Sequence, residues 1–258
     1  MDLETIYNED CLETMSKMDE RSVDVVLTSP PYNTSRKSAT NLDNHEARYE
    51  EYGDCLTDEE YTEWSIKIFE GFDKVLKPNG CVLYNMSYSS ENTWLLWNLV
   101  AALQQRTNFV VADCIVWKKK SALPNNTSSN KLTRICEFVF VFCRKDEFAT
   151  FNCYKGESST RTTGQTMYAN VFNYVDAPNN DYSCPIHKAT YSTILCRKLL
   201  GVYSKEGDVV YDPFMGVGTT AIACVRDKRR WIGSEISERY CKWAENRIKI
   251  ESSQLRLF

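Results

Sequence analysis

Metal-binding and disulfide-stabilised proteins need patterns that are missing from this 258-residue sequence. Only two histidines are present, His45 and His187, and none of the eleven cysteines belongs to a Cys-x-x-Cys pair. Structural zinc sites need cysteines and histidines at short spacings, whereas the cysteines here stand singly in apolar stretches. We therefore expect no metal site, and we expect most cysteines to be reduced residues of the core.

The sequence also lacks a long apolar run, a signal-peptide pattern and an excess of positive charge. No stretch approaches the apolar length that spans a bilayer, and residues 1–4 are acidic rather than basic and apolar. These absences predict a soluble protein that is cytoplasmic or associated with the nucleoid. The formal net charge is -4, so any surface that binds nucleic acid must be a local one.

What the sequence does contain is an alternation of short apolar runs and segments with helical periodicity. This alternation predicts an α/β domain with helices on both faces of one main sheet. Thr57 and Glu60 have the spacing of a capping box at the start of a helix. We predict strands at 23–28, 81–84, 110–117, 137–143, from 208 and at 231–235, and helices at 11–15, from 57, at 94–103, 187–203, 221–225 and 240–250.

Two stretches show no periodic apolar spacing. Residues 33–56 are polar and charged, which is typical of a long loop that is either functional or disordered. Residues 144–183 are rich in Thr, Ser, Asn and Tyr, and we interpret them as an insertion on the sheet. On this division, residues 1–143 and 184–258 are two parts of one main domain, and the insertion separates them.

A glycine turn, Phe214-x-Gly216-x-Gly218, follows one predicted strand and precedes a helix. Such a turn brings the backbone close to a nucleotide-like ligand at the carboxyl end of a parallel strand. A dinucleotide-binding fingerprint would need a third glycine at position 221, which is Ala221. A purely structural tight turn is the alternative interpretation of this pattern. Glu235 at the end of the next strand favours a ligand, because a carboxylate there can accept both ribose hydroxyls. The alternative for Glu235 is a solvated surface acid.

A second motif, Thr28-Ser29-Pro30-Pro31-Tyr32, ends the strand predicted at 23–28. Consecutive prolines fix the backbone and remove two donors, which leaves rigid carbonyls directed outward. The tyrosine adds a flat stacking surface, and together these groups can hold a base extruded from a duplex. A turn or an exposed ligand for a WW-type domain is the competing interpretation.

Together the two motifs resemble the amino-group DNA methyltransferases, whose catalytic motif is Asp/Asn/Ser-Pro-Pro-Tyr. The similarity includes residues 75–80, Val-Leu-Lys-Pro-Asn-Gly, and covers nearly the whole chain except parts of 33–56 and 144–183. The catalytic motif precedes the cofactor motif, as in the beta type of that family. The resemblance implies a Rossmann-like methyltransferase fold with a mostly parallel sheet of about seven strands. It also implies S-adenosylmethionine as cofactor and a small target-recognition region at 144–183.

The resemblance assigns roles to individual residues as well. Ser29, Pro30, Pro31 and Tyr32 would form the catalytic motif. Glu235 would hold the ribose of the cofactor, Asp10 and Cys11 would meet its adenine, and Asp212 and His187 would approach its methionine end. The sequence around His187 departs from the usual His-Pro-x-x-Phe-Pro of the family. The full set implied for cofactor binding is Asp10, Cys11, Thr28, His187, Asp212, Pro213, Phe214, Gly216, Gly218, Thr219 and Glu235.

The reaction implied is direct methyl transfer to an exocyclic amine of a base. Ser29 Oγ and the Pro30 carbonyl are candidate acceptors for the amine hydrogens, and Tyr32 is the candidate for stacking on the base. Cytosine-C5 methylation needs a cysteine nucleophile in a Pro-Cys pair, and none of the seven prolines precedes cysteine. Serine at the first motif position resembles cytosine-N4 enzymes, so we expect cytosine N4 in double-stranded DNA, with adenine N6 as the alternative.

DNA contacts are expected from Arg36, Lys37 and residues 118–120. These residues follow predicted strands at the sheet edge where the active site is expected. The basic cluster at 226–230 is interpreted as solvated surface charge. A homodimer and a cognate restriction endonuclease are partners that only the resemblance implies. An RNA or protein amine methyltransferase and a catalytically inactive scaffold are the remaining alternatives.

Overall fold

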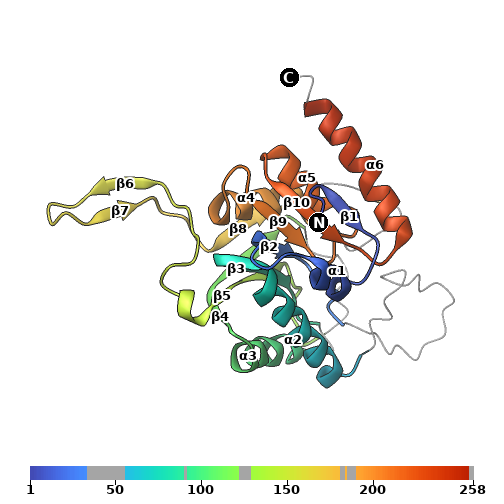
Figure 1. Cartoon of the computed structure of the whole chain (residues 1–258). Helices are drawn as coiled ribbons and strands as arrows, with labels where there is room; N and C mark the ends of the chain where they lie inside the picture. The colour runs from blue at the N-terminus through green and yellow to red at the C-terminus, as the bar shows by residue number, and fades with distance from the viewer. Residues whose placement is uncertain (34–55, 90–91, 122–128, 181–183, 185–189, 256–258) are drawn as a thin grey trace.

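One eight-stranded sheet forms the centre of the protein in its computed structural model, which describes residues 1–33, 56–89, 92–121, 129–180, 184 and 190–255 (Figure 1). The strand order is β1-β10-β9-β2-β3-β5-β4-β8. The strands are β1 (Thr5–Tyr7), β2 (Val23–Thr28), β3 (Leu76–Met86), β4 (Phe109–Lys119), β5 (Cys136–Arg144), β8 (Tyr174–Ala177), β9 (Val209–Asp212) and β10 (Arg230–Ser234). Strand β5 runs antiparallel to both of its neighbours, and every other pair is parallel. The expectation of a mostly parallel sheet is confirmed.

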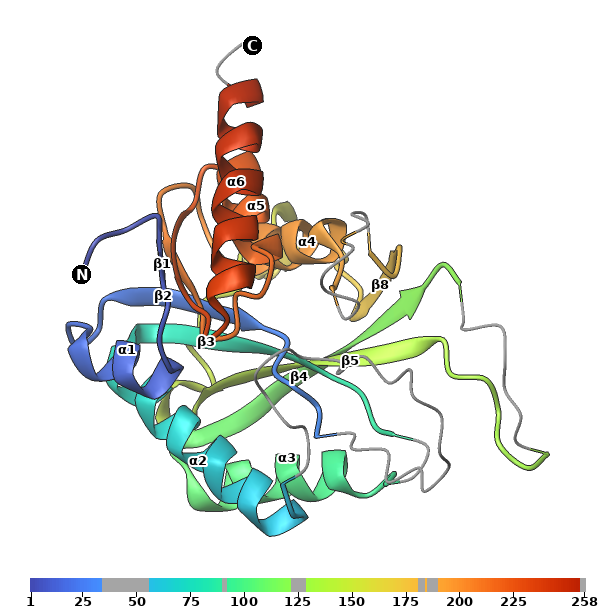
Figure 2. The same cartoon turned by 90° about the vertical axis from the view of Figure 1, so that its right-hand side faces the viewer.

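Six helices cover the two faces of this sheet, as Figure 2 shows. Helices α1, α2 and α3 lie on one face, and α4, α5 and α6 lie on the other. The strands supply both cores, since Val26 of β2 packs with the first face while its neighbours Val25 and Leu27 pack with the second. The helices are α1 (Cys11–Lys17), α2 (Asp58–Val75), α3 (Leu95–Arg106), α4 (Thr193–Tyr203), α5 (Thr219–Arg226) and α6 (Glu238–Leu255).

Two helix starts test the boundaries predicted from the sequence. Helix α2 begins as predicted, because Thr57 accepts a hydrogen bond from the Glu60 amide and Glu60 accepts one from the Thr57 amide. The start predicted at 187 for α4 is wrong, since residues 190–192 are described and are not helical. Ser192 caps that helix instead by accepting a hydrogen bond from the Leu195 amide at 3.4 Å.

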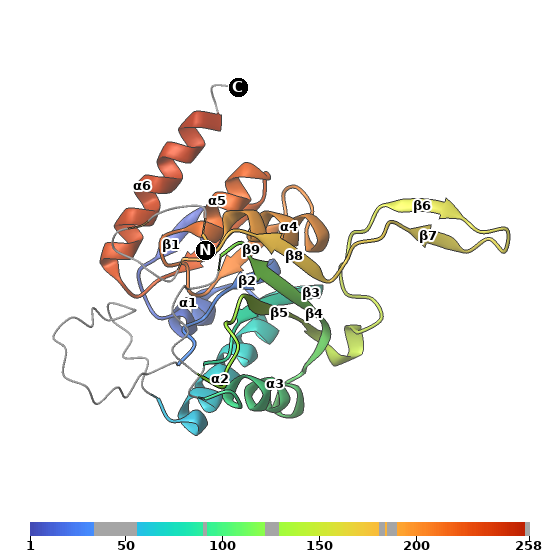
Figure 3. The ribbon, with the colours of Figure 1, turned by 180° about the vertical axis from the view of Figure 1, so that it is seen from behind.

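Residues 144–183 contribute two separate features. A short 3-10 turn, η1 (Lys145–Glu147), leads into a hairpin of β6 (Glu157–Thr160) and β7 (Thr166–Tyr168), which projects away from the main sheet (Figures 1 and 3). The chain then returns as β8, which pairs in parallel with β4 at the edge of the sheet. The Trp117 indole nitrogen of β4 donates to the Ala177 carbonyl at 3.2 Å, and this bond holds the returning strand.

Three absences hold within the described ranges of the chain. None of the helices there is long and apolar enough to cross a membrane. No three His, Cys, Asp or Glu side chains in those ranges gather as a metal site would require. The ten cysteines described there are all free thiols.

Candidate active site

The two sequence motifs meet because β9, β2 and β3 are neighbours and end at the same edge of the sheet. Ligands of open parallel sheets bind at this edge. The Thr28 hydroxyl at the end of β2 donates to Asp212 Oδ1 at the end of β9, at 2.7 Å, and both residues are fully buried. This contact fixes the start of the catalytic motif against the start of the glycine turn.

Asp212 is surrounded by donors from its own chain. Its carboxylate accepts hydrogen bonds from Thr28, from the Thr220 hydroxyl at 2.5 Å and from the Phe214 amide at 3.0 Å. The Tyr191 hydroxyl adds a longer contact of 3.4 Å and also bonds to Thr220. Burial raises the pKa of Asp212, and the hydrogen bonds from Thr220 and Thr28 oppose that shift. Asp212 therefore joins β2, β9 and α5; its role at the methionine end stays a prediction.

The glycine turn adopts backbone conformations that favour glycine. Gly216 has φ +53° and Gly218 has φ +83°, and Gly218 caps the start of α5. A Cβ on Gly218 would lie 3.1 Å from Ala244 Cβ and 3.3 Å from Ile248 Cδ1 on α6. Glycine at 218 is thus required both by the turn and by the close approach of α6.

Glu235 follows β10, and its carboxylate faces the glycine turn. One oxygen accepts a hydrogen bond from the Gly216 amide at 2.8 Å, and the other accepts one from the Ser237 amide at 2.9 Å. The side chain is half-buried, so Glu235 is not a freely solvated surface acid. A carboxylate has about four lone-pair sites, so holding these two amides is compatible with accepting ribose hydroxyls.

Asp10 and Cys11 lie at the start of α1, next to the ends of β9 and β10. Asp10 is exposed and caps the helix by accepting the Leu12 amide at 2.7 Å. Cys11 is buried, and burial raises the pKa of its thiol well above the ordinary value, so the thiol stays protonated. Tyr211 of β9 donates to the Cys11 carbonyl at 3.4 Å and contacts Ser234 at 2.8 Å. These contacts bring α1 to the same edge as Glu235.

The remaining cofactor candidates lie on the same turn. Pro213 and Thr219 are buried within it, and the partly buried Phe214 packs against Trp64 of α2 with ring centroids 5.5 Å apart. The structure therefore gathers every described candidate at one sheet edge, although contact with a cofactor stays a prediction. His187, Arg36 and Lys37 lie outside the described residues.

The catalytic motif turns inward more than the sequence predicted. Pro30, Pro31 and Tyr32 are buried, which contradicts an exposed ligand for a WW-type domain. The Pro31 carbonyl accepts a hydrogen bond from the buried Tyr61 hydroxyl at 2.7 Å, so the expectation that it points outward is wrong. A buried carbonyl needs a donor, and α2 supplies it. The Pro30 carbonyl stays a candidate acceptor for a substrate amine.

Two further polar residues join the motif, and sequence reasoning missed both. Asn85 at the end of β3 donates from Nδ2 to the Tyr32 hydroxyl at 2.7 Å and to Glu137 Oε2 at 3.0 Å. Tyr32 in turn contacts Ser29 Oγ at 3.0 Å and Glu137 Oε2 at 3.1 Å, and Lys119 forms an ion pair with Glu137 Oε1. The available signals were an amide next to the end of a strand whose preceding residues, 81–84, are apolar or aromatic, and an acid near the start of a strand rich in phenylalanine.

Basic residues near the site are partly paired. Lys119 pairs with Glu137, and Lys118 lies 3.4 Å from Asp176 of β8. The cluster at 226–230 is engaged within the molecule, which fits surface charge: Arg226 pairs with Glu251, Lys228 with Glu206 and Arg230 with Glu4, while Arg229 bonds to Ser204. DNA contact by residues 118–120 stays a prediction.

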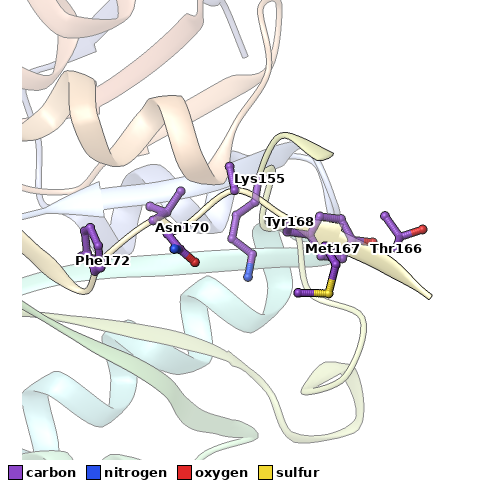
Figure 4. A pocket seen from close by; sticks show the side chains of 8 residues that line it. Lys155, Thr166, Met167, Tyr168, Asn170 and Phe172 are labelled. Carbon is purple, nitrogen blue, oxygen red and sulfur yellow. The ribbon is translucent and has the colours of Figure 1, made fainter. Parts of the chain in front are cut away.

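A separate pocket of about 350 Å³ lies along the projecting hairpin (Figure 4). Its walls come from Lys155 and from residues 166–172, and no residue of the two motifs lines it. Tyr168 is 52% exposed and Phe172 is 76% exposed, so the hairpin presents aromatic rings to solvent.

Comparison with known proteins gives concordant matches. A family model described as DNA methylase matches residues 23–246. The Type II methyltransferase M2.DpnII of Streptococcus pneumoniae is 25% identical over 249 residues, which cover 96% of this chain and 90% of the relative. The solved cytosine-N4-specific PvuII DNA methyltransferase has a TM-score of 0.70 at 19% identity, covering 97% of this chain and 91% of that one. The M1.HpyAVI–SAM complex has a TM-score of 0.62 at 21% identity, covering 94% and 98%. These structures share the α/β fold of this chain.

Proposed function

Because this chain belongs to the DNA methylase family of N6- and N4-amino-methyltransferases, we propose that it methylates N4 of cytosine in double-stranded DNA. The family membership carries the broader activity: the protein is an S-adenosylmethionine-dependent DNA amino-methyltransferase. The first position of the catalytic motif is Ser29. Serine there resembles cytosine-N4 enzymes, whereas Asp or Asn resembles adenine-N6 enzymes, so this residue supports cytosine as the target. The likeness to PvuII methyltransferase, which is cytosine-N4-specific, is consistent with that choice.

The observation that carries the proposal is the position of Ser29. It follows the last residue of β2, beside the Asp212 contact, and it is the half-exposed member of a motif whose other residues are buried. An exocyclic amine is a poor nucleophile because its lone pair is delocalised into the ring. Acceptors fixed at Ser29 Oγ and the Pro30 carbonyl would hold both amine hydrogens and direct the nitrogen lone pair outward.

The residues of the neighbouring strand ends fit an adenosyl cofactor. The turn at Gly216 and Gly218 lets backbone approach a ligand, Glu235 can receive ribose hydroxyls, and Phe214 offers an aromatic ring. Asp10, exposed at the start of α1, would meet the adenine ring. When bound, S-adenosylmethionine supplies an activated sulfonium methyl group, so this chain contributes positioning and electrostatic stabilisation.

Target recognition is assigned in this proposal to residues 144–183. The hairpin of β6 and β7 projects from the sheet and carries an exposed aromatic ring at Tyr168, the segment after it exposes Phe172, and Lys155 lines the same pocket. Aromatic and basic groups of this kind bind nucleic acid through stacking and phosphate contacts. The target base would leave the duplex to reach Ser29, because its amine is not accessible within the stack.

Mass spectrometry of product nucleosides tests the proposal. Purified protein is incubated with S-adenosylmethionine and unmethylated genomic DNA, and the DNA is digested to nucleosides. We expect N4-methylcytosine. N6-methyladenine would overturn the base assignment and keep the family activity. Methylation of RNA or protein but not of DNA would favour that alternative, and cofactor binding without any methylation would favour an inactive scaffold.

Partners follow from the same proposal. A modification enzyme of this kind would protect DNA from a cognate restriction endonuclease that reads the same sequence. Protection of modified genomic DNA against a panel of endonucleases would identify both the sequence and the partner specificity. A homodimer is the proposed assembly, and light scattering of the purified protein tests it.

A further inference from the structure

The hydrogen bonds around Ser29 form a directed chain that ends on a carboxylate. Lys119 pairs with Glu137, whose ionised carboxyl group can only accept hydrogen bonds. Tyr32 therefore donates its single hydroxyl hydrogen to Glu137 Oε2, at 3.1 Å. Tyr32 has no second hydrogen, so Ser29 must be the donor in its 3.0 Å contact with the Tyr32 hydroxyl. Because the Glu137 carboxylate can only accept, hydrogen bonds are donated from Ser29 to Tyr32 and from Tyr32 to Glu137.

The hydrogen bonds of Asn85 are consistent with this direction of donation. Its Nδ2 donates to the Tyr32 hydroxyl and to Glu137 Oε2, and lies 3.3 Å from Ser29 Oγ. The opposite amide orientation would place Oδ1 against the Glu137 carboxylate, acceptor facing acceptor. Asn85 Oδ1 is buried and finds no hydrogen-bond partner among the described residues. An unsatisfied buried acceptor costs about 1–3 kcal/mol, so the network is not arranged for stability alone.

The two ends of the chain are partly exposed, and its middle is buried. Tyr32 and Asn85 are buried, whereas Ser29 is half-exposed at the strand edge where the base would enter. Because the Ser29 hydrogen points to Tyr32, lone pairs of Ser29 Oγ remain to accept a hydrogen from a substrate amine. Ser29 is thus the end of the chain that would meet the substrate, and the half-buried Glu137 beside Lys119 is the opposite end.

We propose that Glu137 is a positioning residue that receives, through Tyr32 and Ser29, the proton lost by the target amine. This inference rests on the proposed amino-methyltransferase function. Transfer of the methyl group leaves the amine nitrogen positively charged, and one N–H bond then breaks with its electron pair remaining on nitrogen. That proton goes to Ser29 Oγ, the Ser29 proton goes to the Tyr32 hydroxyl oxygen, and the Tyr32 proton goes to Glu137 Oε2. The carboxylate becomes a neutral acid and later returns the proton to water.

The substitution Glu137→Gln tests the proposal, because glutamine keeps the size and can accept a hydrogen bond but takes up no proton. The single-turnover rate of methylation is measured with labelled S-adenosylmethionine and unmethylated genomic DNA at saturating concentrations. We expect a loss of about 10²-fold, as for removal of a general base. The dissociation constants for S-adenosylmethionine and DNA should change less than twofold. Equal losses in rate and in binding would indicate a structural role and overturn the proposal.

A matched control is available just beyond the same strand, in η1. Glu147 follows the opposite end of β5, pairs with Arg144 and has a side chain 16% exposed, against 13% for Glu137. Glu147→Gln therefore repeats the same chemical change in a similar environment away from Ser29. Its single-turnover rate should stay within twofold of the unmodified protein.

Tyr32→Phe tests the chain at its middle without depending on the folding of the glutamine variant. Phenylalanine keeps the ring and so any stacking on the base, and only the hydroxyl is lost. We expect a rate loss similar to that of Glu137→Gln, and the double variant should be no slower than the slower single variant, because both changes break one chain. Multiplicative losses, or single-variant rates within twofold of the unmodified protein, would overturn the relay while DNA methylation by the unmodified protein would still support the proposed function. Absence of methylation by the unmodified protein would remove both.

Discussion

The Thr28 hydroxyl donates a hydrogen bond of 2.7 Å to Asp212 Oδ1, joining two side chains that are 184 positions apart in the sequence. One residue ends the strand that leads into the catalytic motif, and the other ends the strand that leads into the glycine turn. Neither side chain is exposed to solvent. If this hydrogen bond were lost, solvent water could not reach Asp212 to replace the donor. The relative position of the two motifs therefore depends on this buried contact.

Thr28→Val should lower the free energy of unfolding by about 2 kcal/mol, because it removes a donor and leaves a buried carboxylate oxygen less satisfied. Urea denaturation followed by circular dichroism measures the change. Thr62→Val on α2 is the control, since the Thr62 hydroxyl makes an exposed hydrogen bond to the Asp58 carbonyl of its own helix. Equal costs for the two variants would contradict the importance of the buried contact.

Gly218→Ala should lower the free energy of unfolding more than Gly207→Ala does, although both glycines have a left-handed backbone conformation. Gly207 has a similar φ of +87° but open space around it, so Gly207→Ala measures the cost of the left-handed conformation, about 1 kcal/mol. At Gly218 the added methyl must also displace Ala244 or Ile248, so we expect about 2–3 kcal/mol in total. Chemical denaturation of both variants checks the difference. Calorimetric titration with S-adenosylmethionine should show weaker binding only for Gly218→Ala.

Replacing Tyr168 and Phe172 by serine should weaken DNA binding about tenfold, because a base that has left the duplex can stack on an aromatic ring, and such stacking contributes about 1–3 kcal/mol per base. Both rings are exposed on or beside the hairpin, so stability and cofactor affinity should not change. Fluorescence anisotropy with labelled duplex DNA measures the effect. Ile250→Ser is the control, since Ile250 is 51% exposed but lies on α6, outside residues 144–183. Unchanged DNA affinity would remove the hairpin from target recognition.

Glu251→Gln should destabilise the protein only above mildly acidic pH. The hydrogen bond from Arg226 lowers the pKa of Glu251 from its ordinary value of 4.5 in the folded state. A lowered carboxyl pKa stabilises the fold above the unfolded-state value, and this contribution is lost as pH falls through the folded-state value. At neutral pH the variant should be less stable by about 0.5 kcal/mol, a small figure because Arg226 is partly exposed. Denaturation at pH 7 and at acidic pH should show the difference becoming smaller as pH falls; a constant difference would contradict the assignment.

Much of the fold could be predicted from local patterns. The capping box at Thr57 and Glu60 specifies a helix start through neighbouring residues alone, and the structure has that start. The strand at 23–28 is mostly apolar, with Val23, Val25, Val26 and Leu27, as expected for a strand buried on both faces. Motifs placed at the ends of such strands must meet wherever the strands are adjacent. This is why Ser29 and Gly216 could be assigned to one edge before the strand order was known.

The rest depended on pairings between distant segments. The four residues of β8 carry too short a pattern to indicate a strand, and their place beside β4 follows from tertiary contacts. The order that inserts β5 antiparallel between β3 and β4 brings Glu137 to Asn85. No local feature of either residue indicates that partner. The acid and the amide were therefore invisible to sequence reasoning, although each is unusual within its own strand.

Asn33, directly after the catalytic motif, donates from its side-chain amide to the Leu56 carbonyl at 2.7 Å and accepts the Leu56 amide at 3.0 Å. The chain thus returns, 23 positions later, to the point from which it departed. Leu56 stands directly before the cap of α2, so these two hydrogen bonds tie the end of the catalytic motif to the start of that helix. One amide side chain thus couples helix and motif, and loss of the Asn33 amide would loosen both at once.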